Sequence, residues 1–193
     1  MNTKYVLTDE NKIVNGVKVF RIKATKNFGN AIKDQLGGFI ESEKNLSQSG
    51  KCWVGGDAVV YGNAIVSEDA LVNYNSLVYG DAQIYGHAVI DGSATICGSA
   101  KVCDLAFVIN SATITENATV AGQGIVLDFA TVKGESCILG YVGGTSVVEG
   151  ESIISSNITV YGDSHIKGTQ EISSLLSFEN QAEEIHIKDK IIN

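Results

Sequence analysis

Proline is absent from the 193-residue sequence, and no apolar run approaches the roughly 18 residues that a membrane-spanning helix requires. A chain without proline can pair nearly every backbone N–H, as a stack of β-strands requires. The polar N-terminus lacks the charged and apolar regions of a signal peptide. We therefore expect a protein without membrane contact, located in the cytoplasm or in a virion.

Positive charge is also scarce, because 14 Lys and Arg residues stand against 22 Asp and Glu residues and leave a formal net charge of −8. Binding to a phosphate backbone needs a basic face, so the composition argues against a nucleic-acid polymer as partner. We interpret the acidity as a source of solubility.

Metal-binding motifs are missing as well. The four cysteines form no C-x-x-C pair, and they stand at Cys52, Cys97, Cys103 and Cys137. We expect four free thiols in a reducing compartment and no zinc site. The three histidines lack the spacing to meet as ligands of one metal ion, at His87, His165 and His186. No metal is therefore expected.

What the sequence does contain is a six-residue repeat between Trp53 and Gly140. An aliphatic residue recurs at Val54, Val60, Val66, Val72, Val78, Ile84, Ile90, Ile96, Val102, Val108, Ile114, Val120, Val126, Val132 and Ile138. Two residues before each stands a small residue, most often alanine, and two residues after it glycine is the commonest choice. A fixed short period is typical of a solenoid, in which each coil contacts only its neighbours.

The hexad predicts three short sides and three corners for each coil. In a strand, alternate residues face the same way, so the small and the aliphatic residue point inward and the residue between them points outward. The following corner needs positive φ, which glycine adopts without steric cost and Asn or Asp tolerates. Where glycine is missing, this slot holds Glu68, Tyr74, Asp104, Asn110, Glu116 and Asp128. We expect triangular coils of 18 residues, stacked about 4.8 Å apart.

The repeat resembles the hexapeptide-repeat proteins over roughly residues 52–168. That resemblance implies an all-β fold, a single-stranded parallel left-handed β-helix of about six to seven coils. Handedness does not follow from the period, and a right-handed, bactofilin-like helix is the alternative. The stretch L-G-G-F-I-E-S-E-K-N-L-S-Q-S-G-K-C-W-V, from Leu36 to Val54, and the run V-Y-G-D-A-Q-I-Y-G-H-A resemble the YdcK-like family. That family is bacterial or phage-borne and often labelled putative acyltransferase, which implies the host cytoplasm if the chain is phage-encoded.

The repeat divides the chain into three segments. Residues 1–50 form a small β-rich N-terminal cap, in which strands at 5–7 and 17–23 are joined through Asn15-Gly16, a hairpin signal. Residues 51–178 form the β-helix. Residues 179–193 form a C-terminal cap or arm. The N-terminal cap is expected because an open coil end would leave an unpaired strand edge.

The period slips once, because the step from Ile138 to the next aliphatic residue, Val148, is ten residues. Either four residues are inserted or two are deleted. The outward residues of one face form an apolar column of Trp53, Leu71, Val89, Phe107 and Ile125. A four-residue insertion places Val147 and then His165 next on this column. We therefore expect residues 140–145 to form a loop that protrudes beside it.

An apolar column of this length needs cover. The sequence predicts a homo-oligomer, a trimer or a dimer, whose interface contains Trp53, Leu71, Val89, Phe107, Ile125 and Val147. The preference for an oligomer comes from the hexapeptide-repeat resemblance. The alternative is cover by the chain's own N-terminal cap or C-terminal arm.

The functional hypotheses are those that remain after nucleic-acid binding, metal binding and membrane contact are set aside. The leading hypothesis is a non-catalytic, oligomeric scaffold or binding module without a cofactor, which presents corner and loop residues to a partner or a small ligand. The candidate ligand-binding residues are Tyr141, Gly143, Gly144, Thr145, Tyr61, Tyr79 and His87, although His87 is more simply a solvated turn residue. One alternative, implied by the family resemblance, is an acyltransferase that uses acyl-CoA between subunits with His165 as general base. Another is a phage-type sponge that sequesters a small nucleotide signal.

Overall fold

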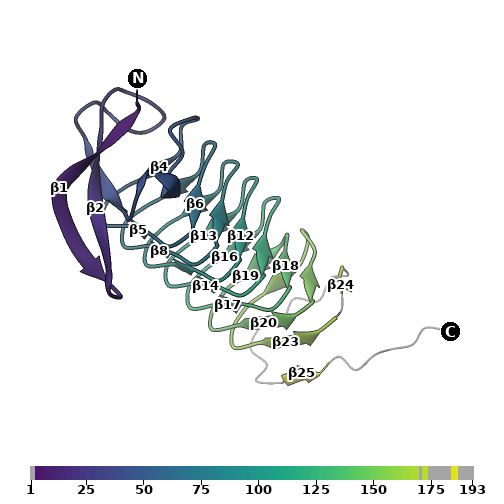
Figure 1. Ribbon diagram of the computed structural model, residues 1–193. Coiled ribbons are helices and arrows are strands. Elements are labelled where there is room, and N and C mark those ends of the chain that lie inside the picture. The colour runs from purple at the N-terminus through teal and green to yellow at the C-terminus, as the bar shows by residue number, and fades with distance from the viewer. Residues whose placement is uncertain (1–2, 170, 174–183, 187–193) are drawn as a thin grey trace.

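The computed structural model describes residues 3–169, 171–173 and 184–186, and it shows an all-β, parallel β-solenoid of about seven turns. Its triangular coils stack along three parallel sheets, and an antiparallel hairpin caps the N-terminal end (Figure 1). The fold class predicted from the hexad is confirmed. Most of the expected C-terminal arm, residues 179–183 and 187–193, lies outside the described residues. No helix in the described ranges is long and apolar enough to cross a membrane.

Each side of the triangle contributes one strand per coil to one sheet, named here by its first outward residue in the regular coils. The Val59 sheet contains β5 (Val59–Val60), β8 (Leu77–Val78), β11 (Thr95–Ile96), β14 (Thr113–Ile114), β17 (Thr131–Val132), β20 (Val147–Gly150), β23 (His165–Gly168) and β25 (Glu184–His186). The Trp53 sheet contains β4 (Trp53–Val54), β7 (Leu71–Val72), β10 (Val89–Ile90), β13 (Phe107–Val108), β16 (Ile125–Val126), β19 (Tyr141–Val142) and β22 (Thr159–Val160). The Ile65 sheet contains β6 (Ile65–Val66), β9 (Gln83–Ile84), β12 (Lys101–Val102), β15 (Thr119–Val120), β18 (Cys137–Ile138), β21 (Ile153–Ile154) and β24 (Glu171–Ile172).

The core is the interior of the triangle. The inward aliphatic residues and the alanines between them are fully buried along the stack, from Val54 to Val160. Small residues are needed there because three chain segments meet inside one narrow coil, and a larger side chain has no free volume to occupy. The inward and outward assignments made from the hexad are therefore confirmed for every regular coil.

Except at Gly140 and Ser156, the described corners adopt the positive φ that the hexad predicts, and the six non-glycine residues in this slot do so as well, with φ between 56° and 61°. Four of them are acids whose carboxylates accept a hydrogen bond from the backbone N–H of the glycine in the next coil. The pairs are Glu68 with Gly86 at 2.9 Å, Asp104 with Gly122 at 2.9 Å, Glu116 with Gly134 at 2.8 Å and Asp128 with Gly144 at 3.2 Å. These bonds offset the cost of the left-handed conformation at the four acids.

The N-terminal cap consists of the hairpin β1 (Tyr5–Val14) and β2 (Val17–Ala24), followed by β3 (Leu36–Ile40) and the 3-10 turn η1 (Glu43–Asn45). The expected hairpin turn is confirmed, since Asn15 and Gly16 both have positive φ. Strand β3 pairs antiparallel with β2 and parallel with β5, and thus joins the hairpin to the first coil.

The cap replaces the missing preceding coil with polar side chains. The buried Asn45 amide donates to the carbonyls of Gly62, at 3.0 Å, and Ala64, at 2.9 Å. The buried Lys4 ammonium donates to the Cys52 carbonyl at 2.9 Å. The backbone acceptors that would otherwise face outward from the first coil are therefore paired, as buried carbonyls must be.

The interpretation of the phase slip as a four-residue insertion is wrong. Tyr141 and Val142 form β19, which pairs with β16 below and β22 above, so two residues are deleted at the corner between Ile138 and Tyr141. Residues 140–145 are not a protruding loop. Val147 pairs with Thr131 and His165 pairs with Val147, so both residues lie on the Val59 sheet and not on the apolar column. The column instead continues from Ile125 to Tyr141 and Thr159.

The paired carbonyls beneath the first coil lead to a stability prediction. Replacing Asn45 with Ala removes the amide that donates to two carbonyls and accepts from the Ser42 N–H at 3.0 Å. We expect Asn45→Ala to lower the free energy of unfolding by about 2 to 3 kcal/mol, because buried polar groups lose their partners. Urea denaturation measures this value. The control is Asn63→Ala, whose exposed amide donates to Asp81 and accepts from Lys44 at the surface, and this change should cost less than about 0.5 kcal/mol. Equal losses in the two variants would contradict this account of the cap.

Candidate functional site

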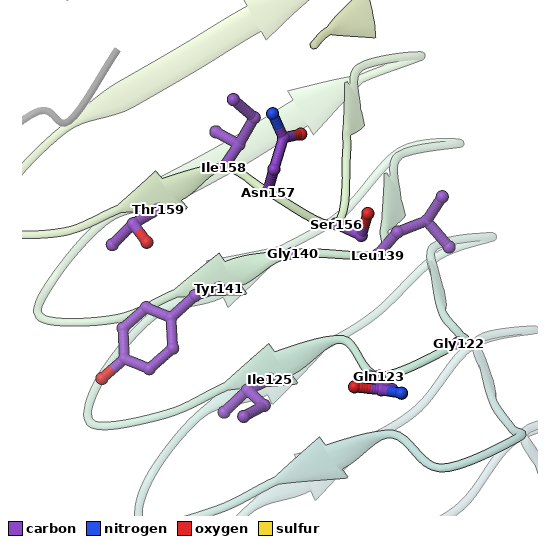
Figure 2. Close-up of a pocket in the computed structure, with 10 residues that line it drawn as sticks. All are labelled: Gly122, Gln123, Ile125, Leu139, Gly140, Tyr141, Ser156, Asn157, Ile158 and Thr159. Carbon is purple, nitrogen blue, oxygen red and sulfur yellow. The ribbon is translucent and has the colours of Figure 1, made fainter. Parts of the chain in front are cut away.

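The two-residue deletion leaves a notch in the corner between the Ile65 and Trp53 sheets. Leu139 and Gly140 make a short corner between two full corners, those of Gly122-Gln123 in the coil below and Ser156-Asn157 in the coil above (Figure 2). The notch has a volume of about 640 Å³ and extends onto the outer face of the Trp53 sheet. There the Tyr141 side chain lies between those of Ile125 and Thr159.

The backbone of the notch differs from that of the regular corners. In the regular coils, at the corner between the Ile65 and Trp53 sheets, the residue after the positive-φ slot donates its N–H to a carbonyl of the next coil. These bonds run from Asp69 to Gly86 at 3.0 Å, from His87 to Asp104 at 2.7 Å and from Leu105 to Gly122 at 2.9 Å. The next donor in the series, Gln123 N–H, has no partner among the described residues. The carbonyl of Ser156 in the coil above also has none within the described part of the chain.

Two glycines adapt the stack to the short corner. Gly124 fills an inward slot that holds Ala, Ser or Cys in the other regular hexads, and a Cβ there would lie 2.5 Å from the Ile138 carbonyl oxygen. Gly140 is the inward small residue of the next strand, and a Cβ there would lie 2.5 Å from the Ile158 carbonyl oxygen. Both distances are too short for a Cβ atom, so the shortened corner can form only with glycine at the two positions.

The groups that line the notch are uncharged. They comprise the side-chain amides of Gln123 and Asn157, the hydroxyls of Tyr141, Ser156 and Thr159, and hydrocarbon from Ile125, Leu139 and Ile158. Burial, with a smaller effect from the Asp128 carboxylate, raises the pKa of the Tyr141 hydroxyl, so it stays a neutral hydrogen-bond donor at physiological pH. Such a lining suits a neutral polar ligand and provides no carboxylate, imidazole or amine for general acid–base chemistry.

The other predicted ligand-binding residues of the 140–145 segment form an ordinary corner between the Trp53 and Val59 sheets. Gly143 is buried, and its missing side chain leaves room for the Tyr161 ring, whose centroid lies 6.3 Å from that of Tyr141. Gly144 occupies the positive-φ slot. Thr145 is exposed, and its hydroxyl donates to the Gly162 carbonyl at 3.1 Å. Of the predicted ligand-binding residues in this segment, Tyr141 alone lines the notch.

Tyr61, Tyr79 and His87 lie at other places on the solenoid. Tyr61 and Tyr79 stack with ring centroids 5.2 Å apart, but Tyr61 is buried under the hairpin and its hydroxyl accepts from the Asn15 side chain at 3.0 Å. A hydrogen bond with Cys97 raises the pKa of Tyr79 to about 12. His87 is an exposed corner residue 3.9 Å from Asp69. The structure brings none of these three to the notch.

A charged cluster on the Val59 sheet surrounds His165. The carboxylate of Glu149 lies 2.6 Å from the Lys133 ammonium, 3.0 Å from His165 Nε2 and 3.3 Å from the Lys167 ammonium. The hydrogen bond from Lys133 is the largest of the interactions that lower the pKa of Glu149 to about 2. His165 is thus held in an ion-pair network on a sheet that does not line the notch. No group of three metal-binding side chains occurs in the described ranges.

The apolar column is covered at one end by the chain itself. Trp53 is only 3% exposed, because the Phe28 ring packs edge-on against it at 5.4 Å. Phe107, at the middle of the column, is 41% exposed, and Leu71, Val89 and Ile125 are half-buried. Cover by the N-terminal cap, the alternative considered from the sequence, therefore applies to Trp53, and the column remains open from Leu71 to Tyr141.

Comparison with models of known protein families gave no match, and comparison with curated protein sequences gave none either.

The ion-pair network leads to a prediction about pH. The pKa of Glu149 in the folded protein is about 2, below its ordinary value of 4.5, so its stabilising effect is present above pH 4.5 and is lost as the pH falls toward 2. We expect Glu149→Gln to lower the free energy of unfolding by about 2 kcal/mol at pH 7, a value reduced by solvent screening at this partly exposed site. The difference from wild type should shrink at pH 2. Urea denaturation at the two pH values measures it.

The matched control is Glu151→Gln, because Glu151 is an exposed acid in the same segment. Its stability should follow that of the wild type at both pH values. A deficit of Glu149→Gln that is the same at pH 7 and pH 2 would show that packing, and not charge, is what the substitution disturbs.

Proposed function

We propose that the protein is a non-catalytic β-solenoid binding module that holds a small, neutral, polar ligand in the notch. The observation that carries this proposal is the notch itself, a recess with an open backbone donor, an open backbone acceptor and an uncharged lining. An acyltransferase would need a general base at its acceptor site. His165, the candidate for that role, lies on the Val59 sheet beside Glu149.

The proposal includes the family and the assembly. The hexad and the triangular coil support membership of the hexapeptide-repeat proteins with a left-handed coil, and the segment from Leu36 to Val54 supports the YdcK-like group. The open part of the apolar column supports a homo-oligomer, with Leu71, Val89, Phe107 and Ile125 at the contact between copies. Because Ile125 and Tyr141 belong both to this column and to the notch, a neighbouring copy would lie beside the ligand.

The oligomer is tested by mass in solution. We expect wild-type protein to form a dimer or trimer and Phe107→Glu to shift it to the monomer, because a carboxylate at the centre of the column would be desolvated without a partner. Light scattering coupled to size exclusion measures the mass. The control is Phe129→Glu, which changes a phenylalanine that is 69% exposed at a corner outside the column and should keep the wild-type mass. A monomeric wild type would exclude this interface.

Ligand binding is tested with a variant in which the notch is filled. Insertion of Gly-Asn between Leu139 and Gly140 restores the six-residue period, and each of the three ladder steps that now span 16 residues becomes 18 residues long. The inserted residues occupy the space of the notch. Circular dichroism and a cooperative thermal transition establish that this filled variant folds.

The probes are coenzyme A, cyclic nucleotides, neutral mono- and disaccharides and blocked dipeptides. A ligand of the notch raises the melting temperature of the wild type as its concentration increases above the Kd, and leaves that of the filled variant unchanged. A probe that stabilises both proteins equally binds elsewhere. If no probe distinguishes the two proteins, the assignment of the notch as the binding site fails.

A further inference from the structure

The regular corners show what the notch lacks. In the corner at Asp104-Leu105, the peptide group between the two residues bonds in both directions along the stack. Its carbonyl accepts from His87 N–H in the coil below at 2.7 Å, and its N–H donates to the Gly122 carbonyl in the coil above at 2.9 Å. One peptide group therefore links each corner to both neighbouring corners.

At the short corner this linking peptide group is absent, although the groups on both sides of it are present. Gln123 N–H is the open donor from below, and the carbonyl of Ser156, which occupies its slot without positive φ, is the open acceptor from above. The short corner does not replace the missing group, because the N–H groups of Leu139 and Gly140 both donate to the Ile154 carbonyl, at 2.8 Å and 3.1 Å. The two open groups belong to coils two ladder steps apart, and in a regular corner the interval between such groups is filled by one peptide group with a hydrogen bond at each end.

We infer that the notch binds a secondary amide in the trans form, whose carbonyl accepts from Gln123 N–H and whose N–H donates to the Ser156 carbonyl. This inference rests on the proposed function and names the chemical class of its ligand. The ligand amide takes the place of the peptide group that the deletion removed, so the hydrogen-bond ladder runs through the bound molecule.

The surroundings of the notch restrict what the amide is attached to. The substituents on its two sides meet uncharged groups, the Leu139 side chain toward the Ile65 sheet and Tyr141 with Ile125 toward the Trp53 sheet. The side-chain amides of Gln123 and Asn157 are exposed and can bond to hydroxyl or amide groups. A neutral dipeptide and an acetamido sugar both carry a secondary trans amide with polar, uncharged substituents, and the Tyr141 ring offers either one an apolar contact surface.

The test follows the backbone amide signal of Gln123 in ¹⁵N-labelled full-length protein by NMR. The probes are acetyl-glycyl-asparagine methylamide, which reproduces the Gly62-Asn63 pair of a regular corner, and N-acetylglucosamine. The matched control is the analogue in which esters replace all three secondary amides, because an ester keeps the carbonyl and loses the N–H. We expect saturable shifts of the Gln123 signal, affinity about tenfold weaker for the ester, and no binding to the filled variant.

The outcomes distinguish a peptide from an acetamido sugar as the source of the amide, and they distinguish failure of the amide inference from failure of the proposed function. Binding by the dipeptide alone assigns a peptide ligand, binding by the sugar alone assigns an acetamido sugar, and both results support the inference. Equal affinity of amide and ester, with loss of both in the filled variant, would overturn the inference and leave the proposed function intact. If neither the dipeptide nor N-acetylglucosamine shifts the Gln123 signal, the inference is overturned too. The proposed function fails separately, if no compound of any class distinguishes the wild type from the filled variant.

Discussion

The structure depends on one requirement, a continuous ladder of backbone hydrogen bonds that joins each coil to the coils below and above it. Strands of two residues contribute few hydrogen bonds within a coil, so the ladders along the stack hold the coils together. This requirement brings the coils close together and leaves room only for alanine, serine and short aliphatic chains inside. It explains why the cap supplies Asn45 and Lys4, whose side chains substitute for the backbone donors of a coil that is not there.

The same requirement gives part of the negative charge a structural role. Four acids stand in corner slots where glycine would be less strained, and each binds the backbone N–H of the next coil through its carboxylate. The lone carboxylate of Glu149 is shared by two lysines and His165 in a comparable way. The net charge of −8 therefore reflects more than solubility, which was the only reason that composition offered.

The fold could be predicted from the sequence because each physical demand of the coil repeats every six residues. These demands are a small inward residue, an aliphatic inward residue and a corner residue that adopts positive φ. The sequence did not predict the notch, because outward positions are weakly constrained and an apolar residue at Val147 is compatible with the apolar column as well as with the Val59 sheet, where it lies. Gly124 is the informative residue, because it is the one glycine among the inward small residues that precede the phase slip, and a Cβ there would collide with the backbone of the next coil. The contact of Lys133 with Glu149 lies outside the prediction for the same reason, because these two residues align only in the register with two residues deleted, whereas Glu149 and Lys167 align in either register. Gln123, Ser156 and Asn157 line the notch with backbone groups or neutral side chains, and no motif identifies such residues.

The deletion at Leu139-Gly140 also shows how one corner of a repetitive fold can become different from the others without disturbing the rest of the stack. Because side chains alternate with a period of two, removing a pair of residues at a corner leaves the inside and the outside of every later strand unchanged, whereas removing one would turn each of them over. Corners are therefore the places where such a chain tolerates changes in length, in units of two. Each such change opens or closes one recess of predictable hydrogen-bonding capacity. A designer could move the notch along the stack, or build several, by choosing which corner loses its pair and placing glycine at the two inward positions beside it.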